Sequence, residues 1–154
     1  MAASFFSLER EAALFRVCRD LVRLRTEEPL QFIDLTELVA ERVRRAEVAE
    51  GLVTVQSRHT TAAVVVNENE PRLLQDLVDL LEHLAPRGAR YQHNELPHEP
   101  PNGHAHARAL LLPTSVCLNV TGSTIDLGRW QRIFLLELDG PRERSLSVQV
   151  LGAP

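Results

Sequence analysis

The sequence GLVTVQSRHTTAAVVVNENE, residues 51–70, contains the strongest structural signal of the chain. Residues 52–55 and residues 62–66 are rich in β-branched and apolar side chains, which favour extended strands. The second run has almost no polar interruption, so at least one of the two strands is predicted to be buried on both faces. Residues 57–61, with the sequence SRHTT, separate the runs. The stretch therefore predicts two strands joined by a short polar segment.

Two helices are predicted, one on each side of this pair of strands. Asp34 followed by Glu37 resembles a capping box, and the apolar residues after it recur at helical spacing, with Gly51 as the candidate C-terminal cap. The second helix is predicted to begin at Pro71, whose fixed φ suits the first helical position, and its apolar face extends to Leu84. The two predicted helices thus flank the central strands in the sequence.

Further strands are predicted near both ends of the chain. Residues 22–26 alternate apolar or Thr side chains with arginines, as in a half-exposed strand, and the last third contains three strand-like segments: residues 114–120, 130–138 and 145–151. Residues 89–106 are rich in Pro, His, Asn and Gly, and such a long connection is more typical of a functional loop than of a linker.

Helices and strands that alternate this unevenly predict an α+β fold. With 154 residues the chain has the length of one domain. We expect a single compact domain over residues 16–154, with a mixed or antiparallel β-sheet and two main helices, preceded by an N-terminal arm at residues 1–15.

Composition and charge limit the classes of partner. The formal net charge is -4, and no basic run with interleaved aromatic residues occurs, so we expect no nucleic acid and no membrane as partner. Cys18 and Cys117 lie far apart without CxxC spacing and in apolar, strand-like segments, which predicts buried, inert thiols. The chain also begins without a recognisable signal segment, and we expect a cytoplasmic protein.

Three histidines stand where loops and strand ends can bring them together: His59, His93 and His106. Imidazoles in such an arrangement suit Zn²⁺ or a similar divalent ion such as Mg²⁺, with an open position for water or substrate. On spacing alone, however, a single histidine is more often a surface residue or a hydrogen-bonded core residue. The remaining three are predicted at the surface: His83, His98 and His104.

Polar residues around His59 suggest an anion site. Ser57, Arg58, Thr60 and Thr61 together offer hydroxyls and a guanidinium that suit a phosphate. The alternative is that Thr simply favours strands and that Arg58 covers a sheet edge.

Polar residues after the second strand of residues 51–70 are further candidates. Asn67 is predicted to bind substrate or phosphate, as is Asn102 in the histidine-rich loop. Glu68 is predicted as a general base or as a carboxylate near a metal, so Glu68 and His59 are the candidate catalytic residues. The alternative is that Asn67 and Glu68 only form the polar start of the helix at Pro71.

Two features near the C-terminal strands each allow two interpretations. Trp130 is expected to anchor either the core or a subunit interface, because large aromatic side chains dominate both settings. Arg142 and Arg144, close to Asp139, either bind an anion or solvate a turn.

Several segments resemble the YjbQ-like family, the so-called secondary thiamine-phosphate synthases. They are GLVTVQSRHTTAAVVVNENE (51–70), YQH (91–93), NGHAHARALLL (102–112), IDLGRWQRI (125–133) and LDGPRER (138–144). The resemblance implies a small α+β fold, assembly as a homotrimer with active-site clefts near subunit contacts, and a metal-binding role for His59, His93 and His106. It also implies a thiamine-phosphate synthase side activity. Pro113, Ser123 and Arg129 depart from the family's usual Gly, Gly and Thr.

The leading functional hypothesis is a transferase that joins phosphorylated pyrimidine and thiazole units with release of pyrophosphate. A metal-assisted hydrolase is one alternative, and a non-enzymatic trimeric binding protein for a small phosphorylated metabolite is the other. The number of anion pockets discriminates the first two, because the transferase needs two pockets and the hydrolase needs one.

Overall fold

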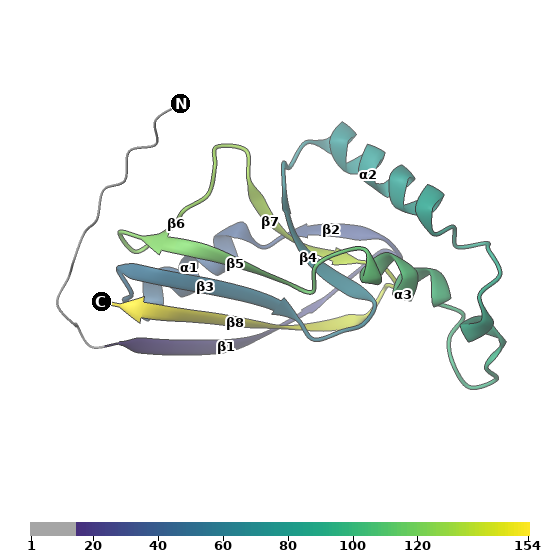
Figure 1. Cartoon of the computed structure of the whole chain (residues 1–154), viewed down its shortest axis with the longest axis horizontal. Coiled ribbons are helices and arrows are strands. Elements are labelled where there is room, and N and C mark those ends of the chain that lie inside the picture. Colours follow the sequence, from purple (N-terminus) through teal and green to yellow (C-terminus); the bar gives the residue numbers. More distant parts are fainter. Residues whose placement is uncertain (1–14) are drawn as a thin grey trace, which may run out of the picture.

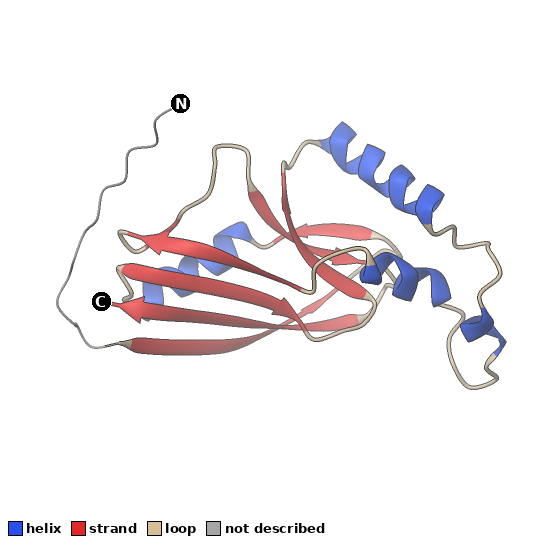
Figure 2. Ribbon diagram, in the orientation of Figure 1, coloured by secondary structure: helices blue, strands red, loops and turns tan. Residues whose placement is uncertain are grey.

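The computed structural model describes residues 15–154, which form three α-helices and two antiparallel β-sheets (Figure 1; Figure 2). The strands are β1 (Arg16–Arg25), β2 (Gln31–Asp34), β3 (Glu50–Ser57), β4 (Ala62–Asn67), β5 (Ser115–Thr121), β6 (Thr124–Ile125), β7 (Arg132–Glu137) and β8 (Glu143–Ala153). The helices are α1 (Thr36–Ala46), α2 (Pro71–Leu84), α3 (Gly103–Leu110) and the 3-10 helix η1 (Gln92–Glu95).

The larger sheet has the strand order β1-β8-β3-β5-β6, and its residues alternate between a buried and an open face. Val53 and Val55 of β3 and Val148 of β8 are buried. Thr54 and Gln149 pair across β3 and β8 on the other face, where they are only partly covered. The strand predicted over residues 145–151 is therefore confirmed as part of β8. The open face is the side on which the molecule presents its polar strand residues.

The smaller sheet, with the order β2-β7-β4, is covered on both faces. Val64 and Leu135 belong to the main core with α1 and the larger sheet, whereas Ala63 and Leu136 belong to a second core cluster with Leu81 of α2. This double burial explains why β4 reads as an almost continuous apolar run.

Helix α2 lies at the periphery (Figure 1), and its buried residue is Leu81, near its C-terminal end. Glu70 caps its start by accepting hydrogen bonds from the backbone N–H groups of Arg72 (3.0 Å) and Leu73 (2.8 Å), which confirms the predicted helix start at Pro71. Near its end, buried Arg108 of α3 forms an ion pair with Glu82 and donates from Nε to the Ala85 carbonyl at 3.0 Å.

The start and end of α1 differ from the prediction. Asp34 Oδ1 accepts from the Thr36 backbone N–H (2.8 Å), and the helix N-cap is Leu35, without a side-chain hydrogen bond. The helix ends at Glu47 in the left-handed region, with φ 50° and ψ 41°. Gly51 instead lies in β3, where an added Cβ would stand 2.1 Å from the Leu151 carbonyl oxygen of β8.

Other differences concern element count and burial. Strand β2 and helix α3 were not predicted, because each is short and α3 lies inside the segment read as a loop. Cys18 and Cys117 are exposed, so the prediction of buried thiols is wrong. The edge position of β1 and the open face of β5 explain this exposure.

Residues 1–14, most of the predicted N-terminal arm, lie outside the described residues. Within residues 15–154, no helix combines the length and apolarity that a membrane crossing requires.

Candidate functional site

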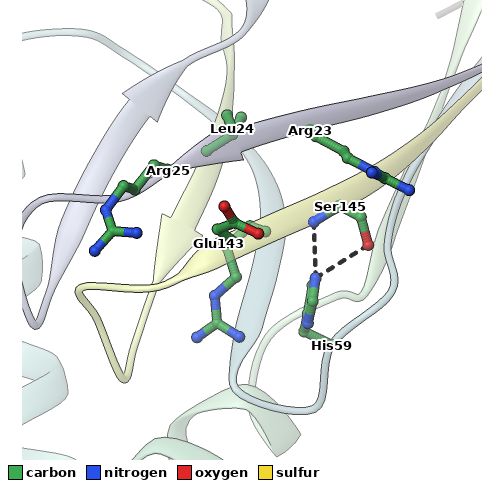
Figure 3. A pocket seen from close by; sticks show the side chains of 7 residues that line it. Arg23, Leu24, Arg25, His59, Glu143 and Ser145 are labelled. Carbon is green, nitrogen blue, oxygen red and sulfur yellow. Dashed lines mark hydrogen bonds between the residues drawn. The ribbon is translucent and has the colours of Figure 1, made fainter.

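A pocket of about 440 Å³ lies where the C-terminal end of β1 meets the start of β8 and the β3–β4 loop (Figure 3). The antiparallel register pairs Arg23 with Ser145 and Arg25 with Glu143. His59 reaches this wall from the β3–β4 loop. The pocket is lined by Arg23, Leu24, Arg25, His59, Glu143, Arg144 and Ser145, and it is called the His59 pocket below.

One ring nitrogen of His59 is occupied by the backbone. The Ser145 N–H donates to His59 Nε2 at 2.8 Å, and the Ser145 hydroxyl oxygen lies 3.3 Å from the same nitrogen (Figure 3). Nε2 therefore carries the lone pair, and Nδ1 carries the hydrogen in the neutral ring. Burial lowers the pKa of His59, and the charges of Arg144 and Arg58 lower the pKa further against the opposing effect of Glu137. His59 is thus a neutral hydrogen-bond donor at pH 7.

The four polar residues predicted to form an anion site around His59 divide into two groups. Ser57 is buried and its Oγ accepts from the His59 backbone N–H at 3.3 Å. Thr61 is also buried, and its Oγ1 accepts from Arg144 Nη2 at 3.0 Å. Both therefore hold the loop in place. Arg58 and Thr60 are exposed, so they are the two of the four that can reach a ligand.

A buried ion pair joins the two sheets behind this pocket. Glu137, at the end of β7, pairs with Arg144 of β8, and Arg144 Nε lies 2.6 Å from Glu137 Oε2. Thr26 donates its hydroxyl to the same carboxylate at 3.0 Å, and the Leu138 and Asp139 N–H groups donate at 2.9 and 2.8 Å. Burial alone would raise the pKa of Glu137, but these hydrogen bonds and the Arg144 charge hold the pKa below its ordinary value.

A second polar cluster lies between the histidine-rich segment and the β7–β8 turn. The amide of buried Asn102 donates from Nδ2 to Asp139 Oδ2 at 2.7 Å, and its Oδ1 lies 3.1 Å from His93 Nε2. Arg142 in turn pairs with Asp139 at 2.7 Å. The ring of His106 packs edge-on against that of His93, with centroids 4.9 Å apart. Both the oxygen and the nitrogen of the Asn102 amide thus have partners within the protein, although Asn102 was predicted to bind substrate or phosphate.

The predicted metal-binding histidines are only partly brought together. His93 and His106 are neighbours, but His59 lies in its own pocket with Nε2 occupied. Among residues 15–154, no three His, Cys, Asp or Glu side chains of one chain come close enough to hold a metal ion. The arrangement of the described residues therefore does not form a three-histidine metal site.

Asn67 and Glu68 lie away from His59. The six residues of β4 separate them from the β3–β4 loop, and such a strand spans roughly 20 Å. Asn67 instead borders an apolar groove with residues of α2 and β7. Glu68 is therefore not part of the His59 pocket, and its role as a general base or as a carboxylate near a metal stays a prediction.

Sequence reasoning missed several residues of these clusters. Arg23 and Arg25 were read as the solvent side of a strand, yet their common face is the wall of the His59 pocket. Ser145 and Asp139 lie in or beside LDGPRER, where only the arginines were linked to anion binding. His104 was predicted at the surface, but it is buried and its Nδ1 has no partner among the described residues. Burial, assisted by the charges of Arg108 and Arg87, lowers the pKa of His104 despite the opposing carboxylates nearby.

Trp130 is not a core residue. It is 61% exposed, and the guanidinium carbon of Arg129 lies 4.8 Å from its ring centroid. The core interpretation is therefore wrong, and a role at a subunit interface stays a prediction.

Comparison with known proteins identifies the family of the chain. Residues 20–153 match the family model described as UPF0047 protein YjbQ-like. A UPF0047 protein of Methanothermobacter thermautotrophicus is 42% identical over 131 residues, which cover 85% of this chain and 90% of the relative. A UPF0047 protein of Archaeoglobus fulgidus is also 42% identical and covers 83% of this chain and 97% of its own length.

Solved structures show the same fold. The crystal structure of a YbjQ-like protein of unknown function from Sulfolobus solfataricus superimposes with a TM-score of 0.85 at 32% identity, covering 90% of this chain and 99% of that one. An uncharacterized YjbQ/UPF0047 protein of Clostridium acetobutylicum gives a TM-score of 0.79 at 34% identity, covering 85% and 98%. The sequence match over most of the chain and the shared α+β architecture agree: this chain belongs to the YjbQ-like UPF0047 family.

Proposed function

We propose that the protein holds the phosphate of a small phosphorylated molecule in the His59 pocket and acts on it as a transferase. The observation that carries the proposal is the neutral His59 ring, fixed by the Ser145 backbone, in a pocket whose strand wall presents Arg23 and Arg25. An imidazole N–H and guanidinium groups are donors suited to phosphate oxygens.

The charges of the pocket are distributed unequally. Arg144 is already neutralised by Glu137, so its guanidinium adds little net charge to the pocket. Arg23 lies on the side of His59 and Ser145, whereas Arg25 lies beyond Glu143 (Figure 3). Glu143 offsets part of the positive charge at the Arg25 side. Arg23 is therefore the cation best placed to share a phosphate with His59.

The specific reaction rests on the family resemblance. A thiamine-phosphate synthase joins the pyrimidine and thiazole units, and the bond to the departing pyrophosphate breaks as the new bond forms. Donors fixed in advance stabilise the negative charge that develops on such a leaving group. Arg23 and the His59 N–H supply two such donors, and exposed Arg58 lies in the adjacent loop.

The test compares wild-type protein with Arg23→Gln in a coupled assay for thiamine phosphate, with and without added Zn²⁺ or Mg²⁺. Loss of one charge-assisted phosphate contact, about 1.5–3 kcal/mol, predicts a decrease of about 10- to 150-fold in kcat/KM. Arg45→Gln is the matched control, because Arg45 is an exposed arginine on α1 outside the pocket. The control is expected to keep wild-type activity.

Direct binding separates the transferase from its alternatives. Inorganic phosphate is titrated calorimetrically into wild-type and Arg23→Gln protein, and we expect weaker binding by the variant. If the protein forms thiamine phosphate only at background level but binds phosphate in a way that depends on Arg23, the trimeric binding protein is favoured. Release of inorganic phosphate from a phosphate ester without joining of two substrates would favour the hydrolase. Absence of phosphate binding by wild-type protein would contradict the proposal itself.

A further inference from the structure

The open face of the larger sheet contains a second polar cavity, of about 230 Å³. It is formed by side chains from three adjacent strands, β1, β8 and β3, that point to the same side of the sheet. The lining residues are Arg19, Thr54, Gln56, Ser147 and Gln149, and the cavity is called the amide subsite below.

The amide subsite continues the His59 pocket along the same face. Ser145 of the pocket and Ser147 of the subsite are two residues apart on β8, a separation of roughly 7 Å along a strand. Arg23 and Arg19 are four residues apart on β1, or roughly 13 Å. Because residues two and four apart share one face of a strand, a single small molecule can reach both cavities.

The chemistry of the amide subsite differs from that of the His59 pocket. Thr54, Gln56 and Gln149 make no side-chain hydrogen bond to any other residue of the described chain, so their donors and acceptors are open to a ligand. Glutamine amides present both a carbonyl acceptor and N–H donors, and they pair well with flat rings that carry amino and carbonyl groups. Arg19 donates from Nε to the Ser147 hydroxyl at 3.2 Å, which orders one side of the cavity.

We propose that the amide subsite binds the uncharged ring of a phosphorylated molecule whose phosphate lies in the His59 pocket. This inference rests on the proposed function and assigns the ring of a phosphorylated heteroaromatic compound with hydrogen-bonding edges to a site on the open face. Phosphates of plain aliphatic compounds satisfy only the His59 pocket. The discrimination comes from the hydrogen bonds that a ring makes to the polar groups of β3 and β8, which an aliphatic ligand leaves to water.

The test is calorimetric binding of cytidine 5′-monophosphate and ribose 5-phosphate to the full chain. The two probes share the phosphate and sugar, and only the first carries an aminated ring. Wild-type protein is expected to bind cytidine 5′-monophosphate about tenfold more tightly. Thr54→Val combined with Gln149→Met removes two hydrogen-bonding groups with little change in size, and this variant is expected to lose that tenfold preference while ribose 5-phosphate binds unchanged.

Controls separate this inference from the proposed function. Asn119→Ala changes the same open face outside both cavities and is expected to bind both probes like wild type. Equal wild-type affinity for the two probes, or an unchanged preference in the double variant, overturns the ring subsite while phosphate binding stands. Failure of both probes to bind overturns the proposed function together with the inference. A change of molecular mass in the double variant would assign the face to contact between copies and would also overturn it.

Discussion

At the scale of single residues, the buried Glu137–Arg144 ion pair is expected to destabilise the fold when one of its partners is removed. Glu137 is completely buried and accepts hydrogen bonds from Thr26 and from two backbone N–H groups in addition to Arg144. Glu137→Gln leaves the Arg144 charge buried without its counter-ion, which predicts a loss of about 3–5 kcal/mol in the free energy of unfolding. Urea denaturation followed by circular dichroism measures this loss.

The control for the ion pair is Glu27→Gln, an exposed carboxylate near the same end of β1, with an expected change within about 0.5 kcal/mol. The double variant Glu137→Leu with Arg144→Met removes both charges and should recover much of the lost stability, because no buried charge is left unpaired. If Glu137→Gln lowers the free energy of unfolding by less than about 1 kcal/mol, the buried charge of Arg144 does not depend on Glu137 for its stabilisation.

At the scale of elements, the β7–β8 turn is fixed by the close approach of Gly140 to its neighbours. A Cβ at this position would lie 2.2 Å from the Glu28 carbonyl oxygen and 2.8 Å from Glu137 Cγ. Gly140→Ala therefore forces the turn away from the end of β1, and overpacking of this kind predicts a loss of about 1–3 kcal/mol in stability. Gly88→Ala is the matched control, because an added Cβ there meets no atom within 4 Å. Equal unfolding midpoints for both variants would contradict this account of the turn.

At the scale of the whole molecule, the family resemblance implies a homotrimer, and we expect exposed apolar side chains on α2 and at the end of α3 to form its subunit contact. The surface consists of Leu80, Leu84, Leu110 and Leu111, each at least half exposed. A second copy that covers these side chains would remove their apolar area from water, which favours association. Light scattering is expected to give three times the chain mass of 17.3 kDa.

Substitution tests which surface makes that contact. Leu84→Glu combined with Leu111→Glu introduces charges into the apolar surface and is expected to yield monomers at micromolar concentration. Ala89→Glu, at an exposed position just beyond α2, is the control and should keep the wild-type mass. A wild-type monomer would contradict the trimer, and an unchanged mass of the double variant would place the contact elsewhere.

The sequence by itself determined the elements whose signals are local. Pro71 and the apolar spacing after it define α2, and the unbroken apolar run of β4 predicts burial on both faces, as observed in the smaller sheet. These features depend on neighbours within a few residues, so propensity and periodicity are sufficient to find them. The polar loop around His59 was located for the same reason.

Only the tertiary structure decided which polar groups meet. Arg23 and Ser145 become neighbours through the β1–β8 register, and Asn102 is linked to Asp139 across 37 residues of sequence. The same long-range packing separates Glu68 from His59 by the length of β4 and leaves His59 apart from the His93–His106 pair. Strand register and sheet-to-sheet packing depend on contacts between distant segments, and no local pattern of residue types encodes those contacts.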